Sequence, residues 1–302
     1  MVVFFLFDFK CNFCNSISLA ECTFLRSKIK LMVIVGFLLA ALVGISLGLI
    51  GSGGSILTVP ILVYVMGVNP VLATAYSLFI VGSTALVGGI QSAMQKRVDF
   101  KTVLIFGIPS IAAVYSTRLW IVPYIPSEIL SIGGIIITKS IALMVLFAVI
   151  MILASISMIR PSKKSAVDES APLVYNYPMI LLEGTLVGLL TGLVGAGGGF
   201  LIIPALVLLA KMPMKLAVGT SLFIIAAKSL IGFTGDLQGS QLIDWNLLLT
   251  FTGFAIVGIF IGIVLSKKIP GEKLKKAFGW FVLIMGIYII VKELFLPNLG
   301  SH

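Results

Sequence analysis

The sequence predicts an all-α polytopic membrane protein, built as two inverted repeats of about five transmembrane segments each, with short broken helices at glycine-rich loops. The chain of 302 residues is 59% hydrophobic and only 11% charged, whereas roughly a quarter of a globular protein is charged. No Asp, Glu, Lys or Arg occurs from Leu31 to Gln95. A span needs about 20 apolar residues, so this stretch holds more than one crossing. A β-barrel would alternate polar and apolar residues, and that alternation is absent.

A glycine-rich stretch inside the first apolar region recurs in the second half. Gly48-Leu-Ile-Gly-Ser-Gly-Gly-Ser returns 144 positions later as Gly192-Leu-Val-Gly-Ala-Gly-Gly-Gly, and Pro60 and Pro204 follow at equivalent places. Over the aligned region, 20 of 47 positions are identical, whereas an apolar sequence matches itself by chance at about 10–15% of positions. We infer an internal duplication. Two apolar segments interrupted at corresponding places point to the substrate site of a transporter.

Apolar segments follow one another along the chain, five in each half. The segment after each glycine break is short: a helix of 12 residues covers about 18 Å, little more than half of a bilayer core of about 30 Å. Each break is therefore expected near the midplane. The segments are 32–50, 55–66, 72–94, 102–122 and 135–159, then 179–194, 200–210, 216–235, 247–266 and 277–296.

These segments divide the chain into five parts. Residues 1–31 form a variable N-terminal extension, 32–159 the first transmembrane repeat, 160–177 a polar linker, 178–296 the second repeat and 297–302 a tail. With five crossings per half and the linker in the cytoplasm, most of the loop Lys and Arg residues lie inside, as the positive-inside rule requires. An odd number of crossings inverts the second copy. The prediction is a multi-pass membrane protein with both termini outside.

The net charge of +10 does not indicate a nucleic-acid partner, because the basic residues lie in short loops between apolar runs. The only histidine is His302, and the cysteines Cys11, Cys14 and Cys22 all lie in the N-terminal extension. Cys11-x-x-Cys14 has no second pair to complete a metal site. Neither glycine stretch continues as a nucleotide-binding loop. We expect no metal, no cofactor and no enzymatic activity.

The paired glycine breaks are candidates for an anion site. Glycine lets a ligand approach the backbone closely, and the helix that starts after each break presents free N–H groups and a positive dipole end. Serine and threonine hydroxyls can add donors. The alternative is that small residues merely allow tight helix crossings. The candidate residues are Gly51, Ser52, Gly53, Gly54, Ser55, Thr58 and Ser77 in the first half and Gly195, Gly197, Gly198, Gly199, Thr220 and Ser221 in the second.

Four further positions carry charge in or beside the segments. Lys228 lies deep in its apolar segment, where an ammonium costs at least about 2.5–3.5 kcal/mol, so we expect it to attract or compensate an anion; a lysine snorkelling to the interface is the alternative. Glu183 lies a few residues inside its segment and is a candidate for proton coupling or an interfacial acid. Asp99 and Asp244 stand at equivalent helix starts and are expected to be N-caps.

The duplicated pattern resembles that of the sulfite exporter TauE/SafE family, the TSUP transporters. The second half carries it from Gly192 to Pro204 and again in Ala217-Val-Gly-Thr-Ser-Leu-Phe. In the first half Ser55 replaces a glycine and Ala75-Tyr76 replaces Gly-Thr. The resemblance implies a plasma-membrane secondary transporter of small sulfur-containing anions, such as sulfite, thiosulfate, sulfoacetate or related sulfonates. Lys228 lies outside the family pattern.

The function that we predict is alternating-access transport of such an anion, driven by protons or another gradient, because the chain contains no nucleotide-hydrolysing domain. Its expected partners are a small anionic substrate, the lipid bilayer and coupling protons. An anion channel and a transporter of a non-sulfur organic anion remain as alternatives. A membrane enzyme would need catalytic side chains that the segments lack, and a scaffold would bind no ligand.

Overall fold

The computed structural model describes residues 19–51, 54–126, 128–132, 135–159, 177–195, 198–199, 202–203, 206, 212–237, 243–266 and 271–295. These residues are overwhelmingly helical. The helices are α2 (Leu19–Ile50), α3 (Ser55–Pro60), α4 (Pro70–Met94), α5 (Phe100–Ser116), α6 (Val122–Tyr124), α7 (Lys139–Ile159), α8 (Tyr177–Val194), α10 (Met214–Asp236), α11 (Trp245–Leu265) and α12 (Gly271–Phe295), with π-helical turns η2 (Ile61–Val65) and η3 (Thr117–Ile121).

The predicted all-α class is confirmed, with one small addition. Strands β1 (Glu128–Ile132) and β2 (Ile135–Thr138) pair antiparallel between α6 and α7. The segment predicted at 135–159 was therefore wrong over its first residues, and its helix begins at Lys139. The run Ile135-Ile-Ile-Thr138 is β-branched throughout, and such residues favour a strand.

The first helix also begins earlier than predicted. The predicted segment opened at Met32, but α2 runs without interruption from Leu19. The charged residues from Glu21 to Lys30 precede the apolar run and limit it on its N-terminal side. They do not interrupt the helix, because Glu, Arg and Lys are good helix formers. The prediction from hydropathy thus located the apolar part of the helix and missed its N-terminal extension.

Five helical stretches among the described residues are long and apolar enough to cross a membrane: Pro70–Met94, Phe100–Tyr124, Lys139–Ile156, Leu216–Asp236 and Trp245–Leu265. Three shorter apolar helices accompany them, Ile34–Leu49, Ser55–Val65 and Pro178–Val194. Large apolar side chains such as Leu38, Val264 and Ile284 are exposed, as a lipid-facing surface requires. A polytopic membrane protein is therefore confirmed.

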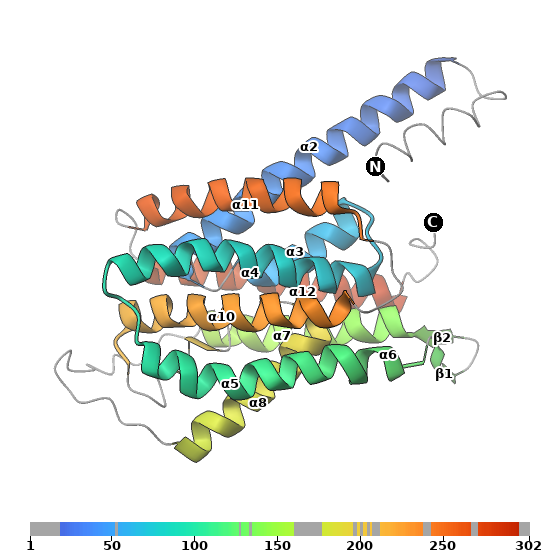
Figure 1. Ribbon diagram of the computed structural model, residues 1–302. Helices are drawn as coiled ribbons and strands as arrows, with labels where there is room; N and C mark the ends of the chain where they lie inside the picture. The colour runs from blue at the N-terminus through green and yellow to red at the C-terminus, as the bar shows by residue number, and fades with distance from the viewer. Residues whose placement is uncertain are drawn as a thin grey trace.

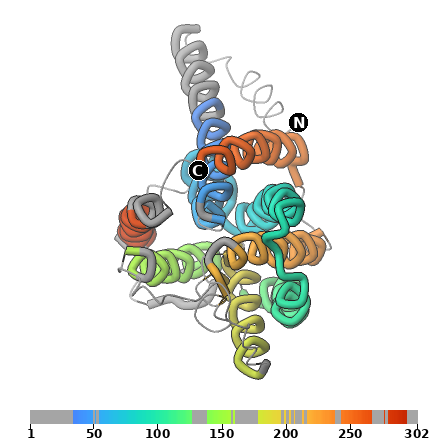
Figure 2. Tube along the Cα trace, turned by 90° about the vertical axis from the view of Figure 1, so that its left-hand side faces the viewer, coloured from blue at the N-terminus to red at the C-terminus, as the bar shows by residue number. Residues whose placement is uncertain are grey.

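Helices α4 and α10, which occupy corresponding places in the two halves, pack against each other in the middle of the bundle (Figure 1). They run antiparallel, because Gly82 meets Leu230 whereas Gly88, further along α4, meets Leu222, which is earlier in α10. Helices α2 and α8 lie on opposite sides of this central pair, and α7 packs beside α12 (Figure 2).

Small residues bring two further helix pairs close together. A Cβ atom on Gly44 of α2 would lie 1.9 Å from the Ala255 carbonyl oxygen of α11. At the corresponding place in the other half, a Cβ atom on Gly188 of α8 would lie 2.5 Å from the Ser110 carbonyl oxygen of α5. Only glycine permits these approaches. The two helices of each pair run parallel, because a residue later in one helix contacts a residue later in the other.

Capping contacts also occur in matching pairs. Asp99 accepts from the backbone N–H groups of residues 101 and 102, and Asp244 does so at residues 246 and 247, which confirms both predicted N-caps. The Asp99 backbone N–H donates to Thr220 Oγ1 over 2.9 Å, and the Asp244 N–H donates to Tyr76 Oη over 2.6 Å. Thr220 and Tyr76 occupy aligned positions, so each helix start is fixed to the central helix of the other half.

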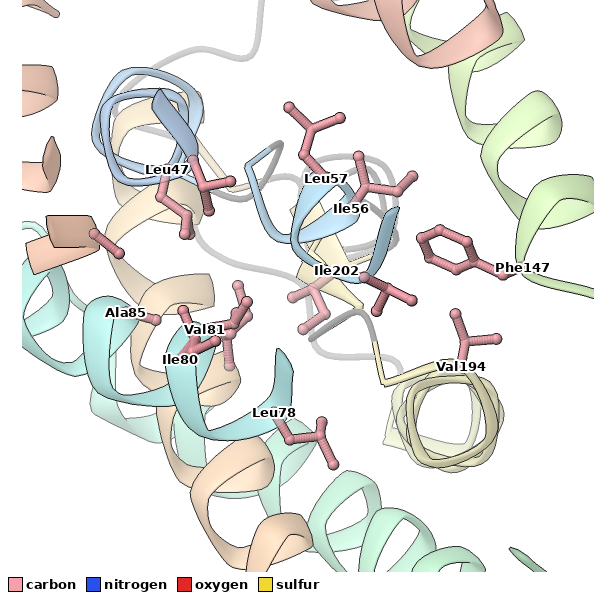
Figure 3. Packing of buried hydrophobic residues seen from close by; sticks show 14 of the residues in the cluster. Leu47, Ile56, Leu57, Leu78, Ile80, Val81, Ala85, Phe147, Val194 and Ile202 are labelled. Carbon is pink, nitrogen blue, oxygen red and sulfur yellow. The ribbon is translucent and has the colours of Figure 1, made fainter. Parts of the chain in front are cut away.

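The apolar core surrounds the first glycine break (Figure 3). Ile56 and Leu57 of α3 belong to one buried cluster with Leu47, Val81 and Ile202. Phe147 of α7 points toward the same region (Figure 3). The short helix is thus held by side chains from both halves, so its position depends on the whole bundle.

We predict that Gly44→Val destabilises the protein by about 1–3 kcal/mol or more, because the new side chain would overlap the α11 backbone. Gly253→Val is the matched control, since an added Cβ on this exposed α11 glycine meets nothing within 4 Å. Unfolding temperatures of the two purified variants in detergent provide the comparison. Equal melting would show that the α2–α11 crossing tolerates bulk.

Candidate functional site

Each glycine break is covered by the central helix of the other half. Gly51 has φ +82°, and a Cβ there would lie 2.3 Å from Val218 Cγ1 of α10. Its counterpart Gly195 has φ +73°, and a Cβ there would lie 2.4 Å from the Thr74 carbonyl oxygen of α4. Left-handed backbone and close contact together require glycine at both places.

Both breaks end at corresponding glycines, where a helical turn begins. The Leu57 N–H donates to the Gly54 carbonyl over 3.2 Å, and the Ile202 N–H donates to the Gly198 carbonyl over 3.3 Å. The first turn leads into the short helix predicted at 55–66, which the structure places at Ser55–Val65. Of the candidates, Ser52, Gly53 and Gly197 lie outside the described residues, as does most of the segment predicted at 200–210. Gly199 is described and buried.

The far end of the short helix is fixed to the last helix of the chain. Tyr64 Oη donates to Glu293 Oε1 of α12 over 2.9 Å, and the Lys292 ammonium lies 4.2 Å from the centre of the Tyr64 ring. Tyr288 packs edge-on against the same ring. The glycine end of α3 and η2 therefore faces the buried region, whereas the other end is held by polar contacts.

Lys228 of α10 lies at the second glycine break. Its side chain is completely buried, and Nζ donates to Thr191 Oγ1 of α8 over 3.0 Å. A Cβ on Gly198 would lie 2.8 Å from Nζ and 2.1 Å from Thr191 Oγ1. Within the described part of the chain, no carboxylate lies within salt-bridge distance of this ammonium. The snorkelling alternative is therefore wrong, because the side chain points into the bundle.

Some of the candidate hydroxyls are buried without a partner among the described residues, and others form hydrogen bonds. Ser77 Oγ is buried without a hydrogen-bond partner among the described residues, as are Thr58 Oγ1 and Ser229 Oγ. Ser55 is also buried, at the start of α3. The other two predicted hydroxyls are occupied: Thr220 binds the Asp99 N–H, and Ser221 Oγ donates to the Val218 carbonyl of its own helix.

Glu183 is not brought to the glycine breaks. It is half-buried on α8, two turns or about 12 Å along the helix from Thr191. Its neighbour Gly184 packs on the Phe106 carbonyl of α5. Its candidate role in proton coupling stays a prediction.

Arg118 is a buried cation that the sequence analysis missed. The structure places it in η3 with a fully buried side chain. Nη1 donates to Thr74 Oγ1 over 3.0 Å and to Asp236 Oδ1 over 3.4 Å. The signal was present, because Arg118 stands inside the predicted segment 102–122, as Lys228 stands inside its own. Thr74 is also the residue that covers Gly195.

The described residues bring together a buried ammonium without a counter-charge among them, the Thr191 hydroxyl and the glycine backbone at Gly198. These are chemical groups that bind anions. The arrangement lacks the parts of a metal centre: no three His, Cys, Asp or Glu side chains gather anywhere in the described ranges.

Comparison with known proteins places the chain in a family. The family model for the sulfite exporter TauE/SafE matches residues 36–289. The chain belongs to the TauE/SafE family. It is therefore a membrane transporter, in agreement with the prediction that it is not an enzyme, and the resemblance read from the paired glycine stretches is confirmed.

Curated relatives of this TauE/SafE chain carry general names. A protein of Xylella fastidiosa described as a probable membrane transporter protein is 32% identical over 253 residues, covering 82% of this chain and 91% of the relative. The probable membrane transporter protein YunE of Bacillus subtilis is 28% identical over 291 residues, covering 88% and 98%. No solved structure matches the chain.

We predict that Gly198→Ala destabilises this TauE/SafE chain more than Gly67→Ala does. Both glycines have positive φ, +60° and +67°, so both substitutions carry a similar backbone strain of about 1–2 kcal/mol. Only at position 198 would the new methyl group collide with Thr191 and Lys228, whereas nothing lies within 4 Å at position 67. Denaturation midpoints of the purified variants measure the difference. Equal midpoints would mean that Lys228 and Thr191 are not packed against the loop.

Proposed function

We propose that this chain is a secondary transporter of small sulfur-containing anions, such as sulfite, thiosulfate, sulfoacetate or other organosulfonates, and that the anion binds at the paired glycine breaks beside Lys228. The observation that carries the proposal is the burial of Lys228 with only a hydroxyl as partner among the described residues. The family description, which names sulfite export, supports the substrate class.

The physical argument concerns the cost of burying a charge. An ammonium taken out of water loses several kcal/mol of hydration, and one neutral hydroxyl replaces only a small part of it. An anion that enters beside Lys228 supplies the missing counter-charge, so binding is favoured by relief of this cost. The glycine at position 198 leaves Nζ room to reach the loop, where backbone N–H groups at the start of the helical turn add donors.

The helix contacts support two inverted repeats. Helices α4 and α10 are aligned copies and run antiparallel, which two copies in the same orientation would not do. The pairs α2–α11 and α8–α5 meet through aligned glycines, Gly44 and Gly188. The capping bonds of Asp99 and Asp244 match in the same way. In our proposal the two repeats rock against each other around the anion and expose it to alternate sides of the membrane.

The driving force in this proposal is an ion gradient, and coupling to protons would pass through Glu183. The family supports a location in the plasma (inner) membrane, and the distribution of Lys and Arg supports a cytoplasmic linker at 160–177. The observed helix directions agree with that arrangement, because α5, α8 and α10 run the same way and α4 runs against them.

The decisive test is uptake of labelled sulfite by the protein in liposomes. We expect Lys228→Met to weaken anion binding roughly 10- to 100-fold, because a charge-assisted hydrogen bond contributes about 1.5–3 kcal/mol. Lys276→Met is the control, since Lys276 is exposed on α12. Without anion, Lys228→Met should melt no lower than wild type, because the substitution removes an uncompensated buried charge.

Three outcomes would change the proposal. Equal uptake by the Lys228→Met and Lys276→Met variants would remove Lys228 from the site. Flux that neither saturates nor shows counterflow would indicate an anion channel. Saturable uptake of acetate or another carboxylate, with none of sulfite, would leave the site in place and replace the substrate class.

The membrane orientation gives a separate prediction. In a variant without the three native cysteines, Ser240→Cys should react with an impermeant maleimide added to intact cells, and Ser165→Cys should react only after the membrane is opened. The first position follows α10 and the second lies in the linker. The reverse pattern would invert the proposed orientation, and labelling of both from one side would contradict five crossings in the second half.

A further inference from the structure

One edge of the Arg118 guanidinium, which we call its free edge, has no hydrogen-bond partner among the described residues although the side chain is buried. Its Nη1 atom donates to Thr74 and pairs with Asp236, whereas Nε and Nη2 have no hydrogen-bond partner among the described residues. These two atoms form the side edge of the guanidinium, which presents two parallel N–H groups. That edge is the part of arginine that binds a carboxylate, phosphate or sulfonate through two bonds at once. Leaving both donors unsatisfied in a buried place costs free energy.

Arg118 packs against the same face of α10 as Lys228, and its hydrogen-bond partner Thr74 covers Gly195. A Cβ on Gly235 of α10 would lie 3.1 Å from Arg118 Cβ. Gly235 is seven residues, or two turns and about 10 Å, beyond Lys228. Between them Gly232 packs on Val114, one turn before Arg118 in the α5–η3 helix. The two buried cations therefore follow each other along one face of α10.

The local charge balance also favours an anion. Asp236 compensates the charge of Arg118 at Nη1, on the side away from the free edge. Each Asp236 carboxylate oxygen lies 3.4 Å from Nη1. Lys139 lies within electrostatic reach of Arg118 and donates to the Val122 carbonyl, one turn after Arg118. One acid and two bases leave an excess positive charge. Because Asp236 already neutralises much of the arginine, an anion there is held more weakly than at an uncompensated cation.

We propose that the Nε–Nη2 edge of Arg118 is a second anion station, two helical turns from Lys228, which binds the oxyanion head of the transported substrate through two hydrogen bonds. The inference rests on the proposed function, since it extends the path of the anion beyond Lys228. The π-helical turn that carries Arg118 supports it, because π-turns are frequent at functional sites. In the proposed orientation the station lies between the Lys228 site and the outer face.

Anion binding to the purified full chain tests the station, with sulfite and methanesulfonate as probes in isothermal titration. Wild type should bind two anions, one more weakly. Arg118→Lys keeps the charge that pairs with Asp236 but lacks the two parallel N–H groups. It should therefore weaken the weaker binding event about tenfold and leave the stronger one unchanged. Lys228→Met should do the reverse.

Asp236→Asn separates this role from a purely structural one. If Arg118 only ties η3 to α4 and α10, Asp236→Asn should lower stability and leave anion binding unchanged or weaker. If its edge binds the anion, the loss of the competing carboxylate should tighten the weaker event. A single binding event in wild type that Lys228→Met removes and Arg118→Lys does not affect would refute the second station alone. Wild type that neither binds nor transports either anion would refute the proposed function.

Discussion

The fold depends on burying the non-helical backbone of the glycine breaks, because this backbone lies in an apolar environment. Peptide groups freed at a helix break have no water to bind in a bilayer and must be packed against protein. In this chain the cover for each break comes from the opposite half: Val218 lies over Gly51, and Thr74 lies over Gly195. Because both covering residues belong to the central pair α4 and α10, neither half can bury its break alone. Burial of either glycine break therefore requires that the two halves pack together.

The same reciprocity appears at the helix starts and crossings. Asp99 and Asp244 each fix an N-terminus to a residue of the other half's central helix, and Gly44 and Gly188 each admit a neighbouring backbone. The packing of the two halves is thus alike although most of their side chains differ. Their chemistry is not alike. Lys228 is aligned with Thr84, whose hydroxyl donates to the Ile80 carbonyl of its own helix, so the positive charge at the break comes from one half.

Much of this could be predicted from local sequence. The glycine stretches, the short helix after Gly54 and the caps at Asp99 and Asp244 depend on residues that are neighbours in the chain. The burial of Lys228 could be predicted too, because the apolar run around it leaves no route to water. Its contact with Thr191 and the enclosure of Arg118 could not, since they depend on how α8, α4 and α10 pack. The start of α2 and the strand at Ile135 were missed because hydropathy reports burial in lipid and not backbone conformation.

The contact between Tyr64 and Glu293 ties the short helix after the first glycine break to the last helix of the chain. This last helix, α12, in turn packs along α7, so the short helix can tilt only if α12 moves with it. The aligned position in the second half is Leu208, an apolar side chain that can form no such bond. The short helix after the first glycine break is therefore tied to α12 by a polar contact, for which the sequence of the second half offers no hydroxyl at the aligned position. If the two halves rock against each other during transport, the first short helix would therefore have to move together with α12 and α7.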